Sequence, residues 1–99
     1  MDDKTISLFL LNMISQTYKV LALKDVEDSN LQIYLDSLCI QLLGGLETFS
    51  ELKSCQKYIS IINIIQYLRI NDFDKQTCKR EILKSTNILD KLSKQFGGI

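Results

Sequence analysis

The sequence predicts an all-α protein, an antiparallel up-down-up-down four-helix bundle that forms a single domain over residues 1–99. Three observations favour this fold. The 99 residues include no proline and only four glycines, so the residues that most often interrupt helices are scarce. Apolar side chains recur at intervals of three and four, which places them on one face of a helix. Polar connections of about four or five residues separate the segments, and short loops favour antiparallel neighbours.

The first helix is expected over residues 4–24. Its apolar face consists of Ile6, Leu10, Met13, Ile14, Tyr18 and Leu21. The longest uncharged run, from Thr5 to Tyr18, has 14 residues, whereas a membrane span needs about 20 predominantly apolar residues. The first residues are acidic and no cleavage site follows, so we expect neither a signal peptide nor a transmembrane helix.

The second helix is expected over residues 30–43. Ser29, followed three residues later by Gln32, fits a capping box that satisfies free amides at a helix start. A ladder of leucines continues at helical spacing: Leu31, Leu35, Leu38 and Leu42. The pair Gly44-Gly45 is a plausible stop for this helix.

The third helix is expected over residues 49–70, opened by a second capping box at Thr48 and Glu51. Its centre is rich in β-branched residues and could form a buried strand. The polar stripe decides for a helix, because it steps by three and four through Lys53, Gln56, Ser60, Asn63 and Tyr67. Most of its circumference is apolar, which predicts either the most central helix or half of an oligomer interface.

The fourth helix is expected over residues 75–96, with an aspartate of the preceding turn Asn71-Asp72-Phe73-Asp74 available to cap it. Its apolar face consists of Cys78, Ile82, Leu89, Leu92 and Phe96. Gly97 and Gly98 follow and end it.

The residue types argue against catalysis, metals and cofactors. Histidine is absent, which excludes Ser-His and Cys-His pairs and the Glu-x-x-His ligands of di-iron bundles. The three cysteines, Cys39, Cys55 and Cys78, are widely spaced and are interpreted as reduced core side chains. Glu47 and Glu51 are four residues apart but are interpreted as part of an exposed helix start. We therefore expect no enzyme, no metal and no cofactor.

The charge is balanced overall and unevenly placed. Residues 1–50 hold three lysines against seven acidic residues, and residues 51–99 hold nine basic against five acidic residues. Arg80, Lys84 and Lys91 share one outer stripe of the last helix, which is either a solvated face or a recognition face for an anionic protein or membrane surface. Aromatic residues are not interleaved with the cations, so nucleic acid is not the expected partner. The candidate partner-binding residues are Arg80, Lys84, Lys91, Lys94, Phe96 and Ile99.

The layout of nearly the whole chain resembles the immunity proteins of pediocin-like (class IIa) bacteriocins. The matching parts are the polar break after the first helix, the leucine ladder, the aromatic-aliphatic third helix, the turn around Phe73 and the charged last helix. The resemblance implies a cytosolic four-helix bundle that protects the producing cell from its own pore-forming peptide, through the sugar-transport permease that serves as receptor. It also implies that specificity lies in the C-terminal half, here the exposed face of residues 75–96 and the tail ending at Ile99.

The expected function is therefore immunity by stoichiometric binding, without a catalytic step. The expected partner is the membrane sugar permease or its complex with the bacteriocin, and the expected location is the cytoplasm, including the inner face of the membrane. The alternative is a helical partner-binding or regulatory adaptor, antitoxin-like or phage-encoded, in which the apolar third helix drives formation of a homodimer.

Overall fold

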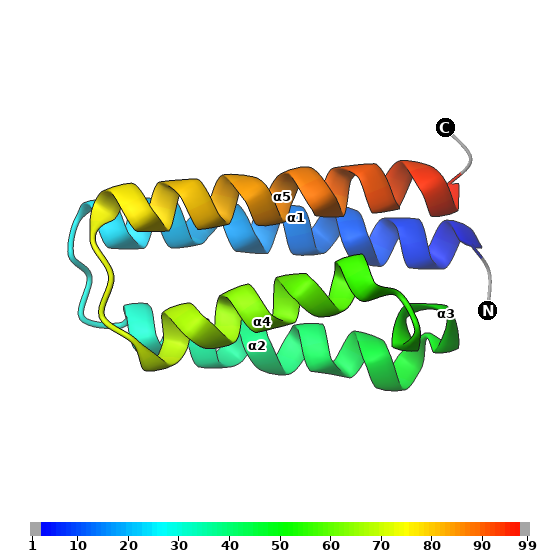
Figure 1. Cartoon of the computed structure of the whole chain (residues 1–99), viewed down its shortest axis with the longest axis horizontal. Coiled ribbons are helices and arrows are strands. Elements are labelled where there is room, and N and C mark those ends of the chain that lie inside the picture. Colours follow the sequence, from blue (N-terminus) through cyan, green and yellow to red (C-terminus); the bar gives the residue numbers. More distant parts are fainter. Residues whose placement is uncertain (1–2, 98–99) are drawn as a thin grey trace.

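The computed structural model describes residues 3–97 (Figure 1), and within that range the protein is all-α, without a β-strand. Its helices are α1 (Asp3–Asp25), α2 (Leu31–Thr48), α3 (Ser50–Lys53), α4 (Gln56–Ile70) and α5 (Lys75–Gly97). The all-helical prediction is confirmed, including the helix rather than strand assignment of the β-branched segment in α4.

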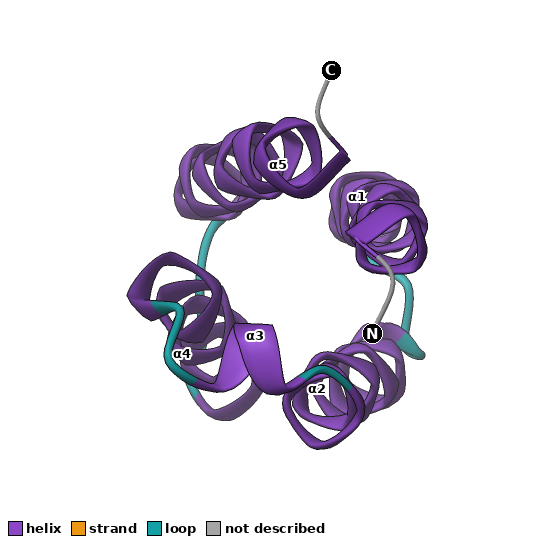
Figure 2. Cartoon of the chain, turned by 90° about the vertical axis from the view of Figure 1, so that its right-hand side faces the viewer, coloured by secondary structure: helices purple, strands orange, loops and turns teal. Residues whose placement is uncertain are grey.

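The helices form an elongated molecule with principal extents of 38 × 24 × 19 Å. α1 and α5 lie side by side along their length, and α2 lies beside α4 (Figures 1 and 2). The α1–α2 and α4–α5 connections lie at one end of the molecule, whereas α3 lies at the other end, beside the start of α1 and the end of α5. Seen along the long axis, the four long helices surround a common centre, which the core side chains fill (Figure 2).

The core contains the predicted face of three helices. All four leucines of the ladder in α2 are buried, as are Cys78, Ile82, Leu89 and Leu92 of α5. The buried face of α4 consists of Tyr58, Ile61, Ile62, Ile65 and Leu68. The apolar surface of α4 is thus largely covered within the chain, and its predicted polar stripe lies outside the core.

The inward face of α1 differs from the prediction. The buried residues are Ile6, Ser7, Leu10, Met13, Thr17 and Val20. Tyr18 is 46% exposed, so its assignment to the core was wrong. Thr17 faces inward in its place, because its hydroxyl donates to the carbonyl oxygen of Met13 at 2.6 Å and needs no other partner.

The predicted stop at Gly44-Gly45 was wrong, because α2 continues through both glycines to Thr48. Gly45 is buried at a close approach of two aromatic side chains, Phe9 and Tyr58. A Cβ at this position would lie 2.8 Å from two carbons of the Phe9 ring and would overlap the hydroxyl of Tyr58. Glycine is therefore required at position 45 for space and not to end the helix.

Neither predicted capping box forms. At the start of α2 the carboxylate of Asp28 accepts from the amide of Asn30 at 2.8 Å, and no side chain caps the helix. Thr48 is the last residue of α2, and the expected helix over residues 49–70 is divided into α3 and α4 by a break at Ser54 and Cys55. Phe49 and Leu52, which precede this break, are both buried in the core.

The start of α5 agrees with the prediction. The carboxylate of Asp74 accepts from the amide of Thr77 at 2.7 Å, which is the expected N-cap contact. Near the other end of α5, the hydroxyl of Ser7 donates to the carbonyl oxygen of Ser93 at 2.9 Å. Small residues at this contact let α1 and α5 approach closely.

α1 is long and apolar enough to cross a membrane by length and composition alone. The uncharged run from Thr5 to Tyr18 is shorter than this helix, because Lys19 ends the run within α1. The same length and composition occur in core helices of soluble proteins and in N-terminal signal sequences. One face of α1 lies in the core of this structure.

Candidate functional site

The candidate site is the outer face of α5, here called the basic face, with Arg80, Lys84, Lys91 and Lys94. All four side chains are exposed, as the sequence predicted. Their spacing places them within about one quarter of the helix circumference, opposite the buried residues Ile82 and Leu89. The face therefore belongs to a helix whose other side is fixed in the core.

Two of these cations are neutralised within α5 and two are not. The guanidinium of Arg80 lies 3.1 Å from the carboxylate of Glu81, and the ammonium of Lys94 lies 3.2 Å from that of Asp90. Within the described part of the chain, Lys84 and Lys91 have no ion-pair partner. These two ammonium groups are the ones that an anionic partner could pair with at no loss of an existing contact.

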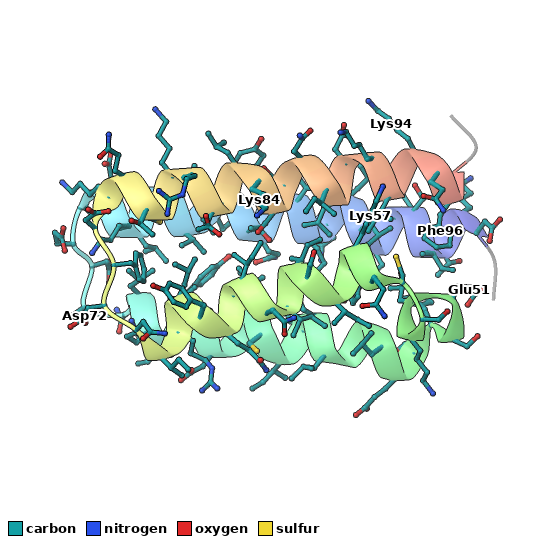
Figure 3. The ribbon with its side chains drawn as sticks, viewed as in Figure 1. Glu51, Lys57, Asp72, Lys84, Lys94 and Phe96 are labelled. Carbon is teal, nitrogen blue, oxygen red and sulfur yellow. The ribbon has the colours of Figure 1, made fainter. Side chains whose placement is uncertain are left out.

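The structure adds Lys57 to this surface. Lys57 lies in the first turn of α4, which packs against α5, and its side chain is exposed. Figure 3 shows Lys57 and Lys84 on the same side of the molecule, where α4 and α5 meet, while Lys94 points away from the bundle. Sequence reasoning missed Lys57 because only the pairing of α4 with α5 brings it to the basic face.

The two remaining candidate residues do not extend the basic face. Phe96 is partly buried and packs against the core, so its ring contributes to the contact between α5 and the bundle. Ile99 lies outside the described residues, as does Gly98.

A second surface lies between α2 and α4. A groove of about 220 Å³ is lined by residues that include Cys39, Ile40 and Leu43. Ile40 and Leu43 of this lining are exposed apolar side chains, and the same two helices carry two more exposed isoleucines, Ile33 of α2 and Ile70 of α4. The guanidinium of Arg69 and the carboxylate of Asp36 face each other across the groove at 3.4 Å. This surface is apolar with a single ion pair, in contrast to the basic face.

The other residues singled out in the sequence do not gather into a reactive centre. Cys39 and Cys78 are buried, Cys55 is half-buried, and all three are free thiols. Burial raises the pKa of the Cys78 thiol, partly offset by the nearby charge of Lys24. Among residues 3–97 no group of three cysteine or acidic side chains is arranged to hold a metal ion.

Comparison with known proteins adds no relative. No family model, curated protein or solved structure matches the chain.

Proposed function

We propose that this protein is a cytoplasmic bacteriocin immunity protein that acts by stoichiometric binding and performs no chemical step. The proposal rests on the resemblance in layout described above and, in the structure, on the basic face of α5. That face presents the ammonium groups of Lys84 and Lys91, which have no ion-pair partner among residues 3–97, on a helix whose opposite side is buried in the core. Helical surfaces with fixed charges suit partner recognition, because charge complementarity guides both encounter and specificity.

The proposal includes a finer description of the fold. We propose an up-down-up-down four-helix bundle formed by α1, α2, α4 and α5, in which α3 is a single turn inserted between the second and third long helices. Its partner would be the membrane sugar permease or the permease–bacteriocin complex. Binding would take place at the inner face of the membrane.

The test is expression of the chain in a sensitive Gram-positive host, followed by tolerance assays over a panel of pediocin-like peptides. The wild-type chain should raise tolerance to one or a few members. The variant K84Q/K91Q should lower that protection with its helical circular dichroism unchanged, since surface changes shift stability by less than about 0.5 kcal/mol each. The matched control is K19Q/K53Q, which removes two exposed lysines from elsewhere on the molecule.

Two results would count against this assignment. Confirmed expression without protection against any peptide would refute immunity. Full protection by K84Q/K91Q would retain immunity but remove the basic face as its recognition surface.

A second candidate function is a dimeric adaptor, which the apolar surface between α2 and α4 favours. These two helices carry Ile33, Ile40 and Ile70, each of which is more than 65% exposed. Sedimentation equilibrium of the wild type and of the Ile40→Lys variant tests this function. A dimer that the variant dissociates would support the adaptor, and a monomeric wild type would refute it.

A further inference from the structure

A cleft of about 460 Å³ lies between the last turns of α1 and the first turns of α5, at the end of the molecule opposite α3. It is separate from the basic face and from the groove between α2 and α4. Its size falls within the range of small-molecule sites in proteins, about 300–1,000 Å³.

The cleft exists because small side chains lie where α1 and α5 meet. Ala22, the only alanine in the chain, lines it from α1, and the thiol of Cys78 lines it from α5. A leucine or isoleucine at either position would fill part of this space. Together with Leu21 these residues give the cleft an apolar lining, and Cys78 is almost completely buried at its inner side.

The charged part of the lining is mainly cationic. Lys24 comes from α1, and Lys75 and Lys79 come from α5, against a single carboxylate from Asp25. In the described part of the chain Lys75 and Lys79 have no ion-pair partner. The ammonium group of Lys24 lies 4.8 Å from the centre of the Phe73 ring and 3.8 Å from the carboxylate of Glu27, so it already has partners within the chain.

We propose that this cleft binds a small amphipathic anion, with a phosphate or carboxylate group held by Lys75 and Lys79 and an apolar group placed against Leu21, Ala22 and Cys78. Such an anion could be a free small molecule or the headgroup region of an acidic lipid, and both share this chemistry. The site does not depend on the free amides at the start of α5, since Asp74 already accepts from one of them.

The test uses n-octyl phosphate as a monomer, with 1-octanol as the uncharged control, and follows backbone amide shifts by NMR. Octyl phosphate should shift the amides of residues 21–25 and 75–79, and octanol should bind more weakly. K75Q/K79Q should weaken binding about fivefold or more, because each exposed charge contact contributes up to about a factor of five. Ala22→Leu should abolish the shifts by filling the cleft while leaving every charge in place.

The matched control is K84Q/K91Q, which removes the same charge from α5 outside the cleft. It should leave the affinity for octyl phosphate within about twofold of wild type, because Lys84 and Lys91 do not line the cleft and their effect on a bound anion is screened by salt. An equal loss in this control and in K75Q/K79Q would show non-specific charge attraction and would overturn the site.

The source of the anion is distinguished with phosphatidylcholine vesicles with and without phosphatidylglycerol. Vesicle binding that requires phosphatidylglycerol and is weakened by both K75Q/K79Q and Ala22→Leu assigns the site to a lipid. Binding of octyl phosphate without vesicle binding assigns it to a free small anion. Absence of both kinds of binding, or equal binding of octanol and octyl phosphate, would refute the proposal.

Discussion

The pair Gly44 and Gly45 allows a sharp test of the packing between α2, α1 and α4. Both glycines lie inside α2, so replacing either with alanine gains helix propensity of about 1 kcal/mol. A Cβ at Gly44 would have no atom within 4 Å. A Cβ at Gly45 would lie 2.8 Å from two carbons of the Phe9 ring and would overlap the Tyr58 hydroxyl. The two substitutions share their chemistry and differ only in the space available.

The expected cost at Gly45 follows from these contacts. Overpacking of a filled core costs about 1–3 kcal/mol. Tyr58 is completely buried, and its hydroxyl donates to the carbonyl oxygen of Leu42, so displacing it adds about 1–3 kcal/mol. After subtraction of the propensity gain of about 1 kcal/mol, Gly45→Ala should lose about 1–5 kcal/mol of unfolding free energy. Gly44→Ala should gain about 0.5–1 kcal/mol.

The Tm and the free energy of unfolding of both variants are measured by thermal and urea unfolding, monitored by circular dichroism at 222 nm. For a domain of about 100 residues 1 kcal/mol corresponds to about 4–8 °C in Tm. Gly45→Ala should therefore melt at least about 4 °C below wild type, and Gly44→Ala should melt above it. The double variant Gly45→Ala with Tyr58→Phe should lose less unfolding free energy than the sum of the two single variants. The Tyr58 hydroxyl contributes to the loss in each single variant, so its contribution is counted only once in the double variant. A Gly45→Ala protein as stable as Gly44→Ala would refute the close approach at Gly45.

Three further predictions follow from burial and capping. Ile62→Asp should lose about 3–5 kcal/mol in urea unfolding, because it places an unpaired charge in the buried face of α4, whereas Asn63→Asp on the exposed side should change little. The hydrogen bonds from Thr77 hold the pKa of Asp74 below its ordinary value of 3.8, so this cap stabilises the fold above about pH 4 and is lost as pH falls through the folded-state pKa. Asp74→Ala should accordingly have a lower Tm than wild type at pH 7, and the difference in Tm should shrink towards about pH 2. A difference in Tm that stays constant with pH would contradict the cap. Iodoacetamide should modify Cys55 first in the native protein, because the other two thiols are buried. Peptide mass mapping measures the order of modification, and earlier modification of Cys39 or Cys78 would contradict this prediction.

The sequence alone determined the helical class and the inward face of most helices. Helical period is a local property, so the leucine ladder of α2 and the apolar face of α5 could be assigned without knowledge of their neighbours. The cap at Asp74 was predictable for the same reason, since it involves a residue only three positions away. The exposed cations of α5 followed directly from the position of its apolar face.

Some signals in the sequence had two local interpretations, and only the neighbouring helices decided between them. Thr17 and Tyr18 are adjacent, and hydrophobicity favoured Tyr18 for the core. The threonine faces inward because its hydroxyl is satisfied by its own helix. The capping boxes at Ser29 and Thr48 matched a motif, but Asn30 and Phe49 are the N-cap residues of α2 and α3. The ring of Phe49 is buried against Phe9 of α1, a contact that the local motif does not report.

The tertiary structure alone decided where helices approach closely and where they leave space. Gly45 is a glycine because Phe9 and Tyr58, distant in sequence, fill the volume that a side chain would occupy. Lys57 joins the basic face, and Lys24 joins Lys75 and Lys79 at the cleft, because α4 and α1 lie beside α5. A sequence pattern reports the period of one helix, whereas shared surfaces depend on which helices pair and on the volumes of the side chains between them.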